Sequence, residues 1–170
     1  MSKMQPSEAL SASAQIAVAL AGFAGVVVAF RNRSVHEWSQ IDKFRLRILL
    51  TNSAIPFMAS MIAMVLSSTT LDPARIWQLC SIITFVMIVN VARIVSRGYG
   101  RFSREEFAAA GGSRIAFFSS SVVGVAVTLL QLYNAITLKT FWPFFTAIAT
   151  LLLLAMLQFI LLVAAGEDKA

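Results

Sequence analysis

Charged residues, histidine and cysteine are scarce in this sequence, and each scarcity excludes a class of function. Only 13% of the 170 residues are charged, whereas a soluble domain has about 25%. A single histidine, His36, and a single cysteine, Cys80, are too few for a clustered metal site, a haem held by two imidazoles or an internal disulfide. We therefore expect the chain to bind no metal ion and no cofactor.

Acid–base residues are also missing from the apolar segments. Asp, Glu, Lys and His are absent from their central parts, where a proton relay or a cation carrier normally needs one. Ser119, Ser120 and Ser121 could be nucleophiles in principle, but no histidine or lysine at the same depth could activate them. The glycines match no phosphate-binding motif. These absences disfavour proton-coupled transport, and they predict that the chain has no catalytic residues and is not an enzyme.

The sequence does contain long apolar runs. Hydrophobic residues make up 58% of the chain, and several runs reach the length of about 20 residues that crosses a bilayer. The runs are Leu10–Phe30, Ile48–Leu66, Ile115–Leu138 and Phe141–Ala165, with a further helix from Pro73 to about Val95. They predict an all-α integral membrane bundle of five transmembrane helices. We expect one transmembrane domain over residues 1–170, with approximate spans 9–30, 46–68, 74–95, 114–137 and 141–164, and no soluble domain.

Capping residues and proline indicate where two of these helices begin. Asp72 can accept hydrogen bonds from free backbone N–H groups, and Pro73 suits the first helical position. Thr140 can cap the last helix in the same way. Because residues 115–165 are far too long for one span, we expect a tight hairpin near Asn134–Thr140.

Lysine and arginine are concentrated at one end of the predicted bundle. Residues 31–47 and residues 93–114 hold five each, whereas the opposite side has only Lys3, Arg75 and Lys139. Short loops rich in these cations stay in the cytoplasm, so we predict an N-terminus outside and a cytoplasmic C-terminus. In general build the chain resembles small multi-pass bacterial inner-membrane proteins. We therefore expect it in the cell membrane, and specifically in a bacterial inner membrane.

We expect the excess of positively charged residues to contact lipid headgroups. The net charge of +6 and the pI of 10.3 could suggest a nucleic-acid partner. The cations, however, flank the apolar runs in short blocks. Cations in such positions set the orientation of membrane helices and contact lipid headgroups. We expect no nucleic-acid partner, and contacts between the basic loops and anionic lipid headgroups. Arg97, Arg101 and Arg104 are the candidates for contact with lipid or with a partner protein.

Small residues recur every four positions in two of the predicted helices. They are Ser13, Ala17, Ala21, Gly25 and Ala29 in the first helix, and Ala116, Ser120, Gly124 and Thr128 in the fourth. Small side chains let helix backbones approach closely. We expect these two faces to pack, either with each other or across subunits of a homo-oligomer or of a complex with another membrane protein.

Uncharged amides are the main polar groups within the predicted spans. Counting inward from the helix ends places Asn52, Asn90 and Gln158 at a similar depth toward the cytoplasmic side. In one interpretation these amides only hold helices together, at roughly 0.6 kcal/mol per interaction. In the other they line a pore or a small-solute path.

Two functions are compatible with these patterns. The leading hypothesis is a non-enzymatic scaffold or subunit of a membrane complex that associates through its small-residue helix faces. The alternative is an oligomeric channel or passive transporter lined by uncharged polar residues. Neither the solute nor the partner follows from the sequence.

Overall fold

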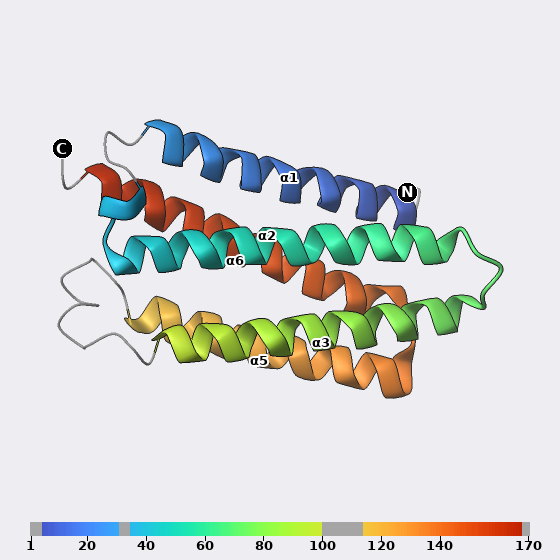
Figure 1. The fold of residues 1–170 in the computed structure, drawn as a ribbon. Coiled ribbons are helices and arrows are strands. Elements are labelled where there is room, and N and C mark those ends of the chain that lie inside the picture. The colour runs from blue at the N-terminus through green and yellow to red at the C-terminus, as the bar shows by residue number, and fades with distance from the viewer. Residues whose placement is uncertain (1–4, 31–34, 100–113, 168–170) are drawn as a thin grey trace.

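The computed structural model describes residues 5–30, 35–99 and 114–167, and five long helices account for most of them (Figure 1). The long helices are α1 (Pro6–Phe30), α2 (Gln40–Ser67), α3 (Pro73–Tyr99), α5 (Arg114–Tyr133) and α6 (Phe141–Glu167), and the short helical turns are η1 (Val35–Glu37) and η2 (Asn134–Leu138). No strand occurs among these described residues. The prediction of an all-α bundle of five helices is confirmed.

All five helices are long and apolar enough to cross a bilayer. The candidate spans contain 21 to 28 residues, and about 20 are sufficient. Many large apolar side chains point outward from the bundle, among them Phe118 and Leu153, which are each 71% exposed. Apolar exposure on this scale suits contact with lipid, because soluble monomers rarely show such surfaces. The chain is a multi-pass membrane protein.

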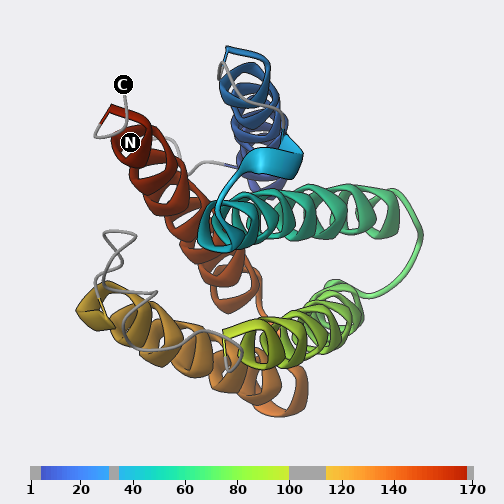
Figure 2. The same ribbon diagram turned by 60° about the vertical axis from the view of Figure 1, so that its left-hand side comes forward.

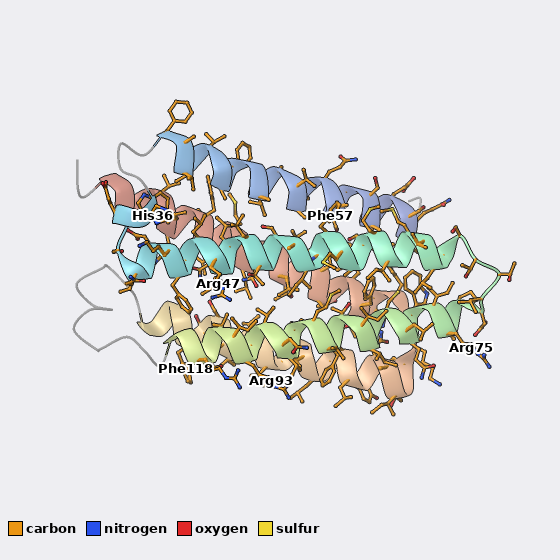
Figure 3. All side chains as sticks on the ribbon, in the orientation of Figure 1. His36, Arg47, Phe57, Arg75, Arg93 and Phe118 are labelled. Carbon is orange, nitrogen blue, oxygen red and sulfur yellow. The ribbon has the colours of Figure 1, made fainter. Side chains whose placement is uncertain are left out.

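The bundle has two chemically different ends. The end that we call the hairpin end carries the α2–α3 turn and the α5–α6 turn. The other end, which we call the basic end, carries the start of α2 and the end of α3. Figure 3 shows Arg47 and Arg93 in the basic half and Arg75 at the hairpin end. The chain starts at the hairpin end and finishes at the basic end (Figure 1).

Helices α1, α2 and α6 pack against one another as a layer, in which the buried residues of α1 extend from Ala9 to Ala24. α2 contacts both α1 and α6, and α1 also contacts α6. The buried apolar residues of this layer include Leu10, Ala17, Leu20 and Ala24 of α1, Leu49, Ala59 and Ala63 of α2, and Phe144, Ile148, Leu152, Ala155 and Leu162 of α6. Lipid tails are as apolar as these side chains, so the layer is held by close packing more than by the hydrophobic effect.

Helix α2 begins at Gln40, earlier than the expected span boundary at residue 46. Ser39 is the cap, because its Oγ accepts a hydrogen bond from the backbone N–H of Asp42 at 3.1 Å. The side chains of Asp42 and Arg45 are 7% and 8% exposed, and they form an ion pair of 3.8 Å. The first turns of α2 are therefore packed into the basic end of the bundle.

Helices α3 and α5 pair with each other and join the other helices mainly near the hairpin end. Among the described side chains, the buried residues of α3 end at Ile88 and those of α5 begin at Val127. Toward the basic end, the described side chains of both helices are half-buried or exposed. Figure 2 shows this pair on one side of the layer of α1, α2 and α6. Packing between the pair and the layer is consequently loose in the basic half.

A buried carboxamide ties the hairpin end together. Asn134, in the π-helical turn η2, donates from Nδ2 to Ser81 Oγ of α3 at 2.6 Å and to the Thr140 carbonyl at 3.0 Å. Its Oδ1 accepts a hydrogen bond from the Thr140 N–H at 3.1 Å. From α3, Gln78 Nε2 donates to the Ala135 carbonyl at 2.9 Å. The α5–α6 turn is thereby fixed to α3.

Two more contacts close the same end. Gln131 Nε2 of α5 donates to the Pro143 carbonyl of α6 at 2.6 Å, and the rings of Trp77 and Phe141 lie 5.0 Å apart. Lys139 completes the turn with a positive φ of 51°. Hydrogen bonds and aromatic contacts from three helices therefore converge where burial on α3 and α5 is greatest.

We predict that Asn134→Ala lowers the free energy of unfolding by about 2 kcal/mol, since three hydrogen bonds are lost at roughly 0.6 kcal/mol each. Reversible unfolding in mixed micelles measures the change. Asn90→Ala is the matched control, because the Asn90 side chain is exposed and bonds only to the Val86 carbonyl of its own helix. Equal effects of the two substitutions would contradict the assigned role of Asn134.

Candidate binding cavity

A cavity of about 350 Å³ lies between α2, α3, α5 and α6 in the basic half of the bundle. It is lined by Ile48, Asn52 and Ile55 of α2; Ile88, Val91, Ala92, Val95 and Ser96 of α3; Ser120, Ser121, Gly124, Val125 and Thr128 of α5; and Leu151, Leu154 and Gln158 of α6. This volume is within the range of small-molecule sites, roughly 300 to 1,000 Å³. The cavity exists because α3 and α5 pack loosely against α2 and α6 there.

Apolar packing closes the cavity toward the hairpin end. Ile55, Ile88, Val127, Ala147 and Leu151 form a core cluster of buried side chains at that level, drawn from all four helices. Three of the five also line the cavity. The cluster is therefore the floor of the cavity, and the polar contacts of the hairpin end lie beyond it.

Two carboxamides on the cavity wall make no hydrogen bond within the described part of the chain. They are Asn52, which is 8% exposed, and Gln158, which is half-buried. Among the described residues, the fully buried side-chain atoms without a partner are Ser60 Oγ, Thr84 Oγ1 and Gln131 Oε1. The amide atoms of Asn52 and Gln158 are not in that group and are open to the cavity. Their donors and acceptors are therefore available to a molecule that enters the cavity, whereas the carboxamide of Asn134 is occupied by protein groups.

The hydroxyl groups on the wall are arranged differently. Ser96 Oγ donates to the Ala92 carbonyl at 2.6 Å, and Thr128 Oγ1 donates to the Gly124 carbonyl at 2.7 Å. Each hydroxyl proton is thus used within its own helix, while the oxygen can still accept a hydrogen bond. No charged side chain is among the described residues that line the cavity. The site suits an uncharged molecule with both hydrogen-bonding and apolar groups.

Of the three amides expected at a common depth, the structure brings only two together. Asn52 of α2 and Gln158 of α6 both line the cavity. Asn90 is exposed instead, and its Nδ2 donates to the Val86 carbonyl at 2.8 Å. Depth along a helix can be counted from the sequence, but the direction of a side chain also depends on how the helix is rotated.

The small residues of α5 line the cavity and do not pack on α1. Ser120, Gly124 and Thr128 are all on the cavity wall, and a Cβ atom at Gly124 would have no atom within 4 Å. The side chain of Ala116 lies outside the described residues. Within the chain, α5 contacts α3 and α6, while α1 contacts α2 and α6. Contacts of either face across subunits stay a prediction.

The small-residue ridge of α1 is only partly inside the bundle. Ser13 and Ala17 are buried and Ala21 is half-buried, but Gly25 and Ala29 are exposed. A step of four residues turns roughly 40° past a full rotation of the helix. Along α1, from the hairpin end to the basic end, the ridge therefore rotates away from the layer. The basic half of this ridge faces outward.

The remaining predicted residues are basic. Arg97 is exposed near the end of α3, whereas Arg101 and Arg104 lie outside the described residues. Sequence reasoning had not assigned Ser96 and Ser121 to a site, because their contribution depends on which helices are neighbours. Among the described residues, no group of histidine, cysteine and acidic side chains could hold a metal ion.

Neither a protein-family model, a curated protein nor a solved structure matches this chain. Its function is therefore argued from the cavity and the surfaces of the bundle.

We predict that Asn52→Leu leaves the free energy of unfolding unchanged or raises it by up to about 1 kcal/mol, because the amide that is removed makes no hydrogen bond within the described part of the chain. Asn134→Leu, the same substitution at a fully bonded carboxamide, lowers it. Both are measured by reversible unfolding in mixed micelles. A loss in Asn52→Leu as large as that in Asn134→Leu would show that Asn52 holds helices together.

Proposed function

We propose that this chain is a non-enzymatic passive transporter for a small uncharged solute, which binds in the cavity between α2, α3, α5 and α6. The observation that carries the proposal is that two carboxamides, Asn52 of α2 and Gln158 of α6, line that cavity without a hydrogen bond within the described part of the chain. Polar groups at membrane depth are costly without partners, so they are retained where they bind something. The apolar remainder of the wall disfavours ions.

The packing of the bundle supports the same function. Toward the hairpin end the cavity is closed by the core cluster that includes Ile55 and Ile88. The basic halves of α3 and α5 are only half-buried, so a change in the tilt of this pair would disturb few close contacts. We further propose that the basic end is cytoplasmic, on the distribution of lysine and arginine, and that the membrane is a bacterial inner membrane, on the general build of the chain.

The proposal predicts solute flux through the purified protein in liposomes. Shrinkage assays with urea, glycerol and acetamide should show faster permeation of at least one of them than through empty liposomes. Asn52→Leu should reduce that flux about tenfold, the equivalent of losing one hydrogen bond of about 1.4 kcal/mol. Gly124→Val should reduce it as well, since the added methyl groups occupy empty cavity space.

Asn90→Leu is the control for this experiment. It makes the same substitution at a similar depth on the outer surface of α3, so flux should be unchanged. No flux above that of empty liposomes, from protein whose helix content is intact, would overturn the transporter proposal. An equal reduction of flux in Asn52→Leu, Gly124→Val and Asn90→Leu would place the solute path outside the cavity.

A specific observation favours a second function, that of a subunit which associates with another copy through α3. Asn90 is exposed in the middle of an outward face with Ile82, Val86 and Ile94, which are 44%, 49% and 46% exposed. A carboxamide that faces lipid is stabilised when a neighbouring helix supplies a hydrogen-bond partner. Two α3 helices that meet at Asn90 would provide that partner to each other.

We predict that Asn90→Cys forms a disulfide-linked dimer in oxidised membrane vesicles. Val18→Cys, on the exposed face of α1, is the control and should remain monomeric. The native Cys80 is buried and should give no background. Equal crosslinking at both positions would indicate random collision, and would exclude an interface at α3.

A further inference from the structure

The seam between α3 and α5 carries a second hollow, on the outer surface of the bundle. It is a groove of about 430 Å³ lined by Val89, Ala92, Arg93, Ser96 and Arg97 of α3 and by Val125, Thr128 and Leu129 of α5. Four of these residues, Ala92, Ser96, Val125 and Thr128, also line the cavity. The groove and the cavity therefore adjoin at the α3–α5 seam.

The polar end of the groove is doubly cationic. Arg93 and Arg97 are four residues apart, so they lie on the same face of α3, and both are exposed. Neither guanidinium has an ion-pair or hydrogen-bond partner among the described residues. Two like charges at this spacing repel each other, and an anion that binds both would relieve the repulsion. Guanidinium groups match phosphate oxygens in geometry as well as in charge.

The other end of the groove is apolar. Val89 lies two turns from Arg97, roughly 12 Å along the helix axis toward the middle of the membrane. From α5, Val125 and Leu129 face the same groove and are each 60% exposed. The groove thus has positive charge at the bilayer surface and aliphatic side chains below it, which is the polarity of a phospholipid in the same leaflet.

We infer that the α3–α5 groove is a discrete binding site for one anionic phospholipid. The phosphate group lies between Arg93 and Arg97, and one acyl chain runs past Val89 and Leu129. The Ser96 oxygen, whose proton is donated to the Ala92 carbonyl, can accept a hydrogen bond from a headgroup hydroxyl. This site is separate from diffuse attraction between basic loops and the membrane surface, because it requires both the arginine pair and the apolar seam.

Such a lipid would have a structural effect on the neighbouring cavity. An acyl chain in the groove covers the outer surface of Ala92 and Val125, whose inner surfaces line the cavity. The lipid therefore seals a loosely packed part of the α3–α5 seam against other lipids. The binding site itself does not depend on whether the cavity carries a solute.

Native mass spectrometry of the purified full-length chain tests the inference. After exchange into phosphatidylglycerol, phosphatidylcholine or an equal mixture, the protein should retain one phosphatidylglycerol per chain and prefer it at least tenfold. Arg93→Gln combined with Arg97→Gln should abolish the preference. Arg75→Gln, at an exposed arginine on the hairpin end of the same helix, should retain it.

Further arms separate a lipid from a simple anion. Glycerol phosphate, which has no acyl chain, should not displace the bound lipid, and Leu129→Ser should weaken retention although the arginines are intact. Arg93→Lys combined with Arg97→Lys keeps the charge and should retain the lipid more weakly than the unaltered chain. If the glutamine variant failed to fold, this lysine variant and Leu129→Ser would decide the question.

Three results would overturn the inference. The first is equal retention of the two lipids by the unaltered chain. The second is an undiminished preference in the folded glutamine variant. The third is displacement by glycerol phosphate, which would indicate an anion site without an acyl component. A loss of solute flux in these variants is not among the criteria, so the lipid site and the transporter proposal can fail separately.

Discussion

The fold depends on how buried carboxamides find partners where no water is available. At the hairpin end, Asn134 satisfies its groups on Ser81 and Thr140, and the turn between α5 and α6 is fixed to α3 as a result. Further along the bundle, Asn52 and Gln158 carry the same chemical group without a hydrogen-bond partner in the part of the chain that the structure describes. In hydrocarbon a bonded amide stabilises a helix contact, whereas an unbonded amide beside a cavity can take a partner from a molecule that enters it. The hairpin end of the bundle is closed, and the basic half holds a largely apolar cavity that carries two such amides.

Much of the fold could be predicted from the sequence because the signals for it are local. An apolar run of about 20 residues identifies a membrane helix whatever it packs against. Asp72 and Pro73 at the start of α3 carry their own capping chemistry, and α3 does begin at Pro73. The start of α2 at Gln40 was harder to predict, because charged residues such as Asp42 and Arg45 are common in solvated loops. Their burial depends on neighbouring helices, which no local pattern reports.

The candidate site was predictable in depth but not in direction. Asn52, Asn90 and Gln158 were placed at one level by counting residues, yet only two of them face the cavity. Adjacent positions on a helix differ by about 100° in direction, so a modest rotation decides whether an amide faces protein or lipid. The ridge on α1 shows the same limit, because a strict four-residue repeat cannot stay on one face. The identity of neighbouring helices and the rotation of each helix about its axis depend on the packing of the whole bundle.

The layer of α1, α2 and α6 has a consequence for how the protein is made. α1 and α2 are synthesised before α6, yet a large part of the core that they share comes from α6. Contacts between segments so distant in sequence form late. Until synthesis reaches α6, the inner faces of α1 and α2 have lipid or insertion machinery as neighbours. α6 thus completes the packing of α1 and α2, and its loss would leave an open pair of helices in the membrane.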